Sequence, residues 1–273
     1  MEVGIARAVT RATESRPATW RPAGGGHTGA PKWLVELEDG RRVFVKGEAS
    51  TEERTVYGEV SGPFLARVHG VEGDVLVLED LSGATWPPPY PGDVRPLFAA
   101  LEEVGETTPP AELPPLRGPR FWELVRADPA PFLNLGLVGD EWLERSLDAL
   151  AAAESGAVLA GEALVHGDVW AGNVCFAPRG AVLVDWADAR RGNPAFDVAL
   201  AAISARIAGA TLPPLDLDLA PWVALLSGHW AVVAPQPLPA SIRADSRLRE
   251  AQRADLAHAL RWAAELLDLP PPG

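Results

Sequence analysis

Residues 163–197 read ALVHGDVWAGNVCFAPRGAVLVDWADARRGNPAFD, and this stretch decides the fold and the chemistry expected of the chain. A short apolar strand is predicted over 163–165. It leads into His166-Gly167-Asp168, and Asn173 follows five residues after the aspartate. A hairpin is predicted next, and it ends at Asp185. This order of strand, loop and hairpin predicts that three oxygen-bearing side chains lie close together.

An Asp, Asn, Asp set suits phosphoryl transfer, in which the protein mainly positions groups and neutralises developing charge. Asp168 follows a strand on a tight loop, from which its carboxylate can accept the proton of a substrate hydroxyl, so we assign it as the general base. Asn173 and Asp185 offer oxygen ligands of the kind that magnesium prefers, and we assign both as metal ligands. Taken singly, each of the three is equally a turn residue, because Asp and Asn are common in turns.

The pattern H-G-D-x-x-x-x-N, present here as HGDVWAGN and followed by VDW and GNPAFD, resembles the aminoglycoside phosphotransferase family. That resemblance implies an α+β, protein-kinase-like fold of two lobes, with ATP and Mg²⁺ as cofactors. It also implies a catalytic base at Asp168 and magnesium ligands at Asn173 and Asp185. Trp170 within the motif is similar to the fructosamine kinase branch, so the reaction type is predicted and the acceptor is left open.

Lys46 is the candidate phosphate-binding residue of the first lobe. A hairpin is predicted around Asp39-Gly40, with Lys46 at the end of its second strand. In the resembling fold, this position carries the lysine that reaches the nucleotide phosphates. The alternative is an edge-strand lysine that promotes solubility. The chain has only two lysines among 24 basic residues, which makes the position of each one informative.

Glu53 is the expected partner of Lys46, by resemblance to a family pattern of Glu with an aromatic residue four positions later. Ser50-x-x-Glu53 is also a capping box, which would direct the carboxylate to backbone amides instead. Glu52 and Glu59 are the substitutes in that case. The helix that begins at Ser50 is predicted to carry an apolar stripe as far as Leu65.

Two further segments are expected to touch the nucleotide. Gly24, Gly25 and Gly26 lack side chains, so their backbone amides can approach a phosphate closely, although a surface turn explains them equally well. Glu79 and Leu81 resemble the hinge between lobes, where backbone groups take the adenine edge. An exposed strand end is the alternative there.

Length and composition favour one two-lobed protein, with residues 1–80 as a nucleotide-binding lobe and 81–273 as a helical lobe carrying the acceptor site. No apolar run is long enough to cross a bilayer and no signal sequence is evident, so a cytoplasmic protein is expected. The net charge of −13 argues against a nucleic-acid partner. It favours a small, cationic acceptor, or it serves solubility alone.

The remaining elements follow from periodicity. Strands are predicted over 33–37, 43–46, 67–71, 75–78, 174–176 and 181–184, and helices over 2–14, 95–104, 121–127, 142–157, 196–208, 220–233 and 241–269. Acidic residues of the helical lobe are weak candidates for contacts with a cationic acceptor: Glu141, Glu144, Asp188, Asp216 and Asp218.

The sequence thus predicts an ATP- and Mg²⁺-dependent phosphotransferase acting on a hydroxyl of a small polar molecule, aminoglycoside-like in one version. One alternative is a fructosamine or ketosamine kinase. The other is a catalytically silent nucleotide-binding module.

Overall fold

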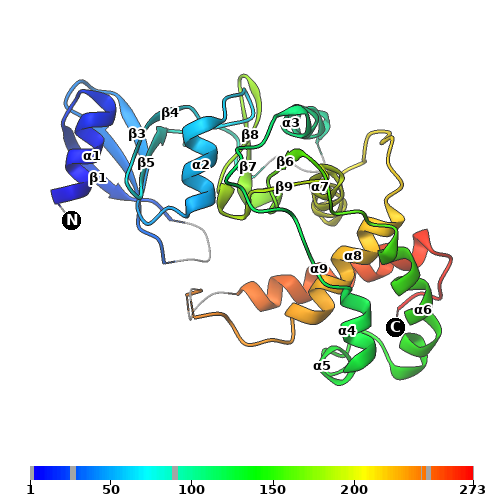
Figure 1. The fold of residues 1–273 in the computed structure, drawn as a ribbon. Helices are drawn as coiled ribbons and strands as arrows, with labels where there is room; N and C mark the ends of the chain where they lie inside the picture. Colours follow the sequence, from blue (N-terminus) through cyan, green and yellow to red (C-terminus); the bar gives the residue numbers. More distant parts are fainter. Residues whose placement is uncertain (1–2, 25–28, 88–91, 241, 244–246, 273) are drawn as a thin grey trace.

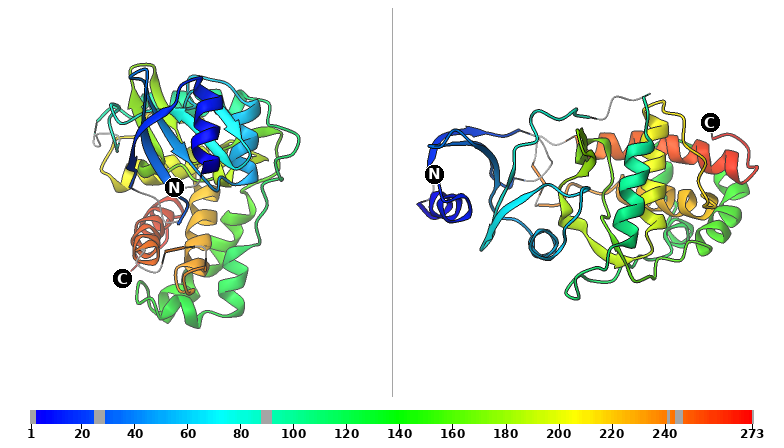
Figure 2. Two further views of the ribbon diagram at one scale, coloured as in Figure 1. Left: turned by 90° about the vertical axis from the view of Figure 1, so that its left-hand side faces the viewer. Right: turned by 90° about the horizontal axis from the view of Figure 1, so that it is seen from above.

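The computed structural model describes residues 3–24, 29–87, 92–240, 242–243 and 247–272. The first part of the chain forms a β-sheet with a helix on each face, and the later part is mainly helical (Figure 1). The view from above shows the same separation into a sheet part and a helical part (Figure 2, right). This is the expected α+β arrangement.

The sheet has five antiparallel strands in the order β1-β2-β3-β5-β4. Its strands are β1 (Pro17–Pro22), β2 (Lys32–Leu37), β3 (Arg42–Lys46), β4 (Val68–Glu72) and β5 (Val75–Glu79). Helix α1 (Val3–Thr13) packs on β4 and β5, and α2 (Thr51–Glu59) lies toward the helical part.

Alternation along the strands explains why the sheet has two apolar faces. Val35 and Val45 belong to a cluster that α1 covers with Ala8 and Val9. On the opposite face, Leu76 and Leu78 belong to a larger core that continues through the helical part. The face that carries Phe44 is therefore the one turned toward the rest of the molecule.

Strand β1 is absent from the expectations, and its sequence explains why. PATWRP starts and ends with proline, which cannot donate to a sheet ladder. The structure accommodates both prolines because β1 is an edge strand, paired with β2 alone.

The prediction that the α2 stripe extends to Leu65 is wrong. The helix ends at Glu59, with Val60 as its C-cap and Pro63 shortly beyond. Proline commonly follows a helix end because it cannot continue the helix. Phe64 and Leu65 instead meet the later hairpin, where the Leu183 amide donates to the Phe64 carbonyl at 2.8 Å.

The helical part follows the predicted order closely. Its elements are α3 (Arg95–Glu106), α4 (Phe121–Ala127), α5 (Ala130–Leu133), α6 (Asp140–Ser155), β6 (Ala163–Val165), β7 (Val174–Ala177), β8 (Gly180–Leu183), β9 (Arg190–Gly192), α7 (Ala195–Ile207), α8 (Ala220–Val233) and α9 (Leu248–Leu266). The one-turn α5 and the strand β9 were not predicted. Helix α9 begins at Leu248, later than the predicted start at 241, and residues 241 and 244–246 lie outside the described part of the chain.

No helix within the described ranges is both long and apolar enough to span a bilayer.

Candidate active site

The loop after β6 places Asp168 by means of a glycine that no other residue can replace without strain. Gly167 adopts φ +86°, a region that favours glycine. A Cβ atom at this position would lie 2.3 Å from the carbonyl oxygen of Asp188. The loop is therefore pressed against the backbone that follows Asp185, which brings two sequence-predicted site residues into one region.

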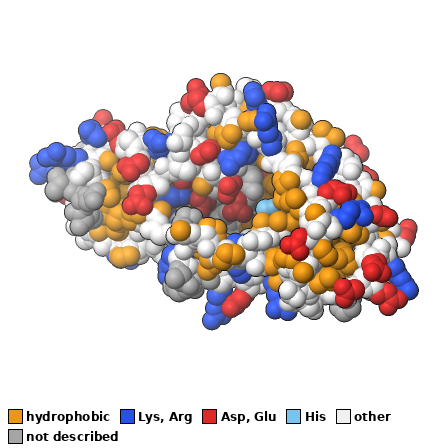
Figure 3. All heavy atoms as spheres, turned by 60° about the horizontal axis from the view of Figure 1, so that its bottom comes forward, with side chains coloured by type: hydrophobic (Ala, Val, Ile, Leu, Met, Phe, Trp, Pro, Cys, Tyr) orange, Lys and Arg blue, Asp and Glu red, His pale blue; other side chains and the backbone are white. Residues whose placement is uncertain are grey.

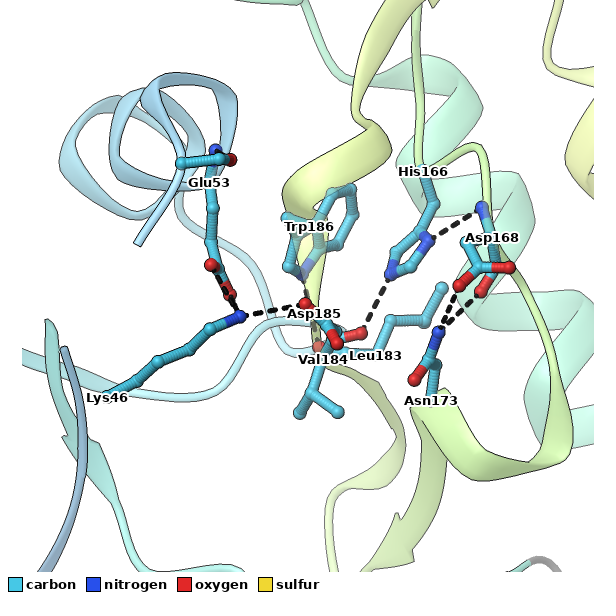
Figure 4. Close-up of polar contacts among 10 residues, drawn as sticks. Lys46, Glu53, His166, Asp168, Asn173, Leu183, Val184, Asp185 and Trp186 are labelled. Atoms are coloured by element: carbon cyan, nitrogen blue, oxygen red, sulfur yellow. Dashed lines mark hydrogen bonds and ion pairs between the residues drawn. The ribbon is translucent and has the colours of Figure 1, made fainter. Parts of the chain in front are cut away.

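Asn173 is tied directly to Asp168. Its side-chain Nδ2 donates to the Oδ2 atom of Asp168 at 2.8 Å and to the backbone oxygen of Asp168 at 2.9 Å (Figure 4). A short 3-10 turn over Ala171–Asn173 closes the loop so that these groups meet. Because both contacts use the amide nitrogen, the Oδ1 atom of Asn173 keeps its acceptor capacity for a metal ion.

The pKa of Asp168 is raised to about 7. Burial is the largest cause, followed by the negative charges of Asp188 and Asp185, while the hydrogen bond from Asn173 opposes the rise. A general base works best when its pKa lies near the operating pH. The environment therefore suits Asp168 to exchange a proton near neutrality.

The raised pKa of Asp168 leads to an expected pH profile. As pH falls below about 7, protonation of Asp168 removes the base, so kcat/KM for ATP at saturating acceptor should fall about tenfold per pH unit. Asp188→Asn removes a charge that raises this pKa, and should shift the acid limb to lower pH. A profile that is the same in the two proteins would contradict the link between these carboxylates.

His166 orients the loop through the contacts of its ring. Its ring is buried, its Nε2 lies 3.0 Å from the Val184 carbonyl oxygen, and its Nδ1 accepts from the Asp168 amide at 3.2 Å. The ring also packs on Trp186, with 4.4 Å between ring centroids. Burial lowers the pKa of His166 to about 4, so the ring stays neutral and holds both contacts.

Asp197, in the first turn of α7, is a structural acceptor for the backbone of the same loop. Its carboxylate accepts from the His166 amide at 2.6 Å and the Gly167 amide at 2.9 Å. Burial raises the pKa of Asp197 to about 7 even though both amides oppose the rise. The position of Asp197 at a predicted helix start within 163–197 indicates an acceptor for backbone amides, but only the fold shows which amides it contacts.

Asp185 receives Lys46 from the other part of the molecule. The Lys46 Nζ lies 2.8 Å from the Asp185 Oδ1, and 2.9 and 2.7 Å from the two carboxylate oxygens of Glu53 (Figure 4). Asp185 itself has φ 65°, a left-handed conformation that Asp tolerates better than most residues. The close-up shows Lys46, Glu53 and Asp185 on one side and Asp168 with Asn173 on the other.

Lys46 determines the charge state of the cluster that it forms with Glu53 and Asp185. Burial opposes a charged lysine, but the charges of Glu53 and Asp185 raise the pKa of Lys46. Burial also opposes ionisation of Asp185, and Lys46 nevertheless lowers the pKa of that carboxyl. The pair is therefore charged, and Asp185 presents an anionic oxygen to the site.

The choice between glutamates is settled by the structure in favour of contact with Glu53. The Ser50 hydroxyl accepts from the Glu53 amide at 3.1 Å, so half of the capping box forms. The Glu53 carboxylate turns to Lys46 and not to the helix start. Glu52 lies 3.9 Å from Arg190.

The predicted glycine contacts are only partly visible. Gly24 is exposed in the connection between β1 and β2, with no atom within 4 Å of where a Cβ would stand. Gly25 and Gly26 lie outside the described residues. The assignment of these glycines to phosphate binding remains a prediction.

The two hinge residues are already engaged with protein groups. The Glu79 carboxylate pairs with Arg179 on the β7–β8 turn and accepts from the Arg67 amide at 2.9 Å. The Leu81 carbonyl accepts from the Ala84 amide at 3.0 Å and from the Trp86 indole at 2.9 Å. The Glu79 amide also donates to the Arg67 carbonyl at 2.9 Å, so a role for Glu79 in adenine binding is left to its backbone carbonyl.

Arg179 ties this hairpin to the sheet part. Besides the Glu79 carboxylate, its guanidinium donates to the carbonyls of Pro63 and Leu65 at 3.1 and 3.2 Å. Arg179→Met should lower the free energy of unfolding by about 1–3 kcal/mol, because a largely covered carboxylate loses its partner. Urea denaturation measures this. Arg95→Met removes an exposed pair with Asp93 and should cost less than about 1 kcal/mol; equal losses would contradict a special role for Arg179.

The space-filling view shows a hollow between the two parts of the molecule, with acidic side chains inside it (Figure 3). Within the described ranges, no three His, Cys, Asp or Glu side chains form a ready-made metal cluster. The Asn173 and Asp185 oxygens nevertheless fit Mg²⁺, which is usually held by one or two carboxylates with phosphate oxygens and water completing the set. Of the acidic acceptor candidates, only Asp188 is shown to act on the Asp168 carboxyl.

Comparison with known proteins identifies the family and the fold of this chain. The model of the Phosphotransferase enzyme family matches residues 2–235. No curated protein gives a significant match. A putative fructosamine-3-kinase from Thermobifida fusca YX-ER1 is 22% identical, with 93% of this chain and 97% of that chain covered and a TM-score of 0.54.

Two other solved structures share the fold. A choline/ethanolamine kinase family protein from Mesorhizobium loti is 14% identical, with 92% of each chain covered and a TM-score of 0.57. A macrolide 2'-phosphotransferase type I is 16% identical over 92% of this chain and 95% of that one, with a TM-score of 0.52. The predicted family and kinase-like fold are confirmed. The chain belongs to the Phosphotransferase enzyme family.

Proposed function

We propose that this phosphotransferase uses Mg²⁺ and ATP to phosphorylate a hydroxyl of a small polar molecule. The proposal rests on two side-chain contacts, of which the first joins distant parts of the chain. Lys46 reaches Asp185 from the sheet, and Asn173 contacts Asp168 within the helical part. If Asp168, Asn173 and Asp185 were unrelated turn residues, they would not be expected to lie together beside a buried lysine.

Each side chain has a defined task in this proposal. Asp168 takes the proton of the acceptor hydroxyl as the oxygen attacks the terminal phosphorus. Lys46, held by Glu53, binds the phosphate chain. The Asn173 Oδ1 and the Asp185 carboxylate hold the metal, which when bound neutralises charge on the transferring group.

The nucleotide lobe is proposed to end near residue 80. Backbone groups from Glu79 to Leu81 would take the adenine edge, and the Gly24, Gly25 and Gly26 segment would lie along the phosphates. A relative of the same fold, LicA, was solved in complex with AMP, at 13% identity and a TM-score of 0.57. That complex supports a nucleotide site in this fold.

For the acceptor, we infer an aminoglycoside-like or other amino-bearing compound, since residues 81–273 hold most of the negative charge. A ketosamine is the second candidate. It is favoured by Trp170 in HGDVWAGN, whose half-buried ring packs on Trp230 with 5.5 Å between centroids. The Trp170 amide donates to the Asp168 carbonyl at 3.1 Å. Aromatic faces attract cationic groups such as the amine of a ketosamine.

The function is tested by ADP release with Mg²⁺, ATP and a panel of acceptors: aminoglycosides, glycated lysine, choline and homoserine. Acceptor-dependent ADP release that is lost on chelation of Mg²⁺ is expected. Nucleotide binding with no ADP release across the panel would favour a catalytically silent module.

A further inference from the structure

The second of the two lysines in the chain lies beside the first. Lys32 begins β2 and is paired in register with Lys46 at the end of β3. Directly opposed residues in an antiparallel pair have Cβ atoms about 4.5–5.5 Å apart and project to the same face of the sheet. All the other residues among the 24 Lys and Arg of the sequence are arginines.

The face on which Lys32 projects is the one that carries the site. Trp33 and Val35 alternate with it and pack in the cluster under α1, on the far face. Lys46 projects from the near face and reaches Asp185. Lys32 therefore emerges on the side of the sheet that faces the helical part.

The positive charge of Lys32 acts on two carboxylates of the site. Burial is the largest influence on the pKa of Glu53 and raises it, Lys46 lowers it, and Lys32 lowers it further. Lys32 also lowers the pKa of Asp185, after Lys46. Two carboxylates from different elements are thus within its electrostatic reach.

Lys32 also lies where the glycine-rich connection ends and β2 begins. The Ala23 amide donates to the Lys32 carbonyl at 2.9 Å and closes the hairpin of β1 and β2 at that point. The segment from Gly24 to Gly29 runs between these two residues. Lys32 therefore follows the predicted phosphate-binding glycines closely in the sequence and is paired with Lys46 in the sheet.

We propose that Lys32 is a second cation for the phosphate chain of the nucleotide, acting beside Lys46. The inference rests on the proposed function. Lys46 shares its charge between two carboxylates, so its net effect on an incoming polyanion is reduced. A second lysine on the same face supplies positive charge where a triphosphate needs it, and its contribution should increase with the number of phosphates.

Calorimetric titration of the full chain in Mg²⁺ tests this, with AMP and a non-hydrolysable ATP analogue as probes. Lys32→Met should weaken binding of the analogue about 10-fold and of AMP less than about 3-fold, because only the analogue carries the full phosphate chain. Lys32→Arg should restore most of the affinity. Arg7→Met, which removes one exposed charge from α1 on the far face, should change neither.

The outcomes separate the two proposals. If the wild-type protein binds neither probe, the proposed function fails and this inference fails with it. If the wild type binds and Lys32→Met binds the analogue equally well, the role of Lys32 alone is overturned. Equal losses for both probes would also overturn it, and circular dichroism of each variant shows whether such a loss reflects misfolding.

Discussion

Replacing Asp168 with asparagine is expected to lower kcat by about two to four orders of magnitude, because the amide cannot accept the proton of the acceptor hydroxyl. Affinity for the nucleotide should stay close to the wild-type value. Asparagine has the same shape, and its oxygen can still accept from the Asn173 amide that now bonds the Asp168 carboxylate. ADP release and a separate nucleotide titration measure the two effects.

Asp148→Asn is the matched control for this substitution. Its side chain lies on α6 and is 89% exposed, so the same change of charge should leave kcat unaltered. Wild-type turnover by Asp168→Asn would exclude Asp168 as the base. Loss of nucleotide binding together with kcat would place its role in binding instead.

Asp185→Asn should abolish the dependence of nucleotide affinity on Mg²⁺. The substitution removes the anionic ligand and takes away one of the two carboxylates that surround Lys46. Asparagine is preferred to alanine here because Asp185 has a left-handed backbone, which Asn adopts at low cost. Titrations of the ATP analogue with Mg²⁺ and with chelator should give different affinities for the wild type and the same affinity for the variant.

A metal effect that persists undiminished in Asp185→Asn would refute the assignment of this residue. Glu53→Gln separates loss of a metal ligand from loss of a partner of Lys46. It removes a negative charge beside Lys46 but leaves the proposed metal ligand in place. That variant should weaken nucleotide binding and retain the response to Mg²⁺. Identical behaviour of the two variants would mean that both act only through the lysine.

The stretch 163–197 predicted the family and the kinase-like fold through its resemblance to a known motif. The periodicity of the surrounding sequence predicted nearly every element of the helical part. The physical reason is local. The spacing in HGDVWAGN, the glycine at position 167 and the hairpin that ends at Asp185 act over a few residues, so the sequence itself carries the geometry. The contact between Asn173 and Asp168 is of this kind, since it spans five residues.

Contacts between distant segments were decided by the tertiary structure alone. Glu53 rather than Glu52 or Glu59 meets Lys46 because α2 packs so that Glu53 lies on its buried face, whereas Glu52 is only half-buried and Glu59 is exposed. Asp197 could equally have capped its own helix, and only the packing of α7 under the loop gives it the amides of His166 and Gly167. Strand pairing places Lys32 beside Lys46. The register of two strands depends on how they pair, so it cannot be read from the sequence of either strand alone.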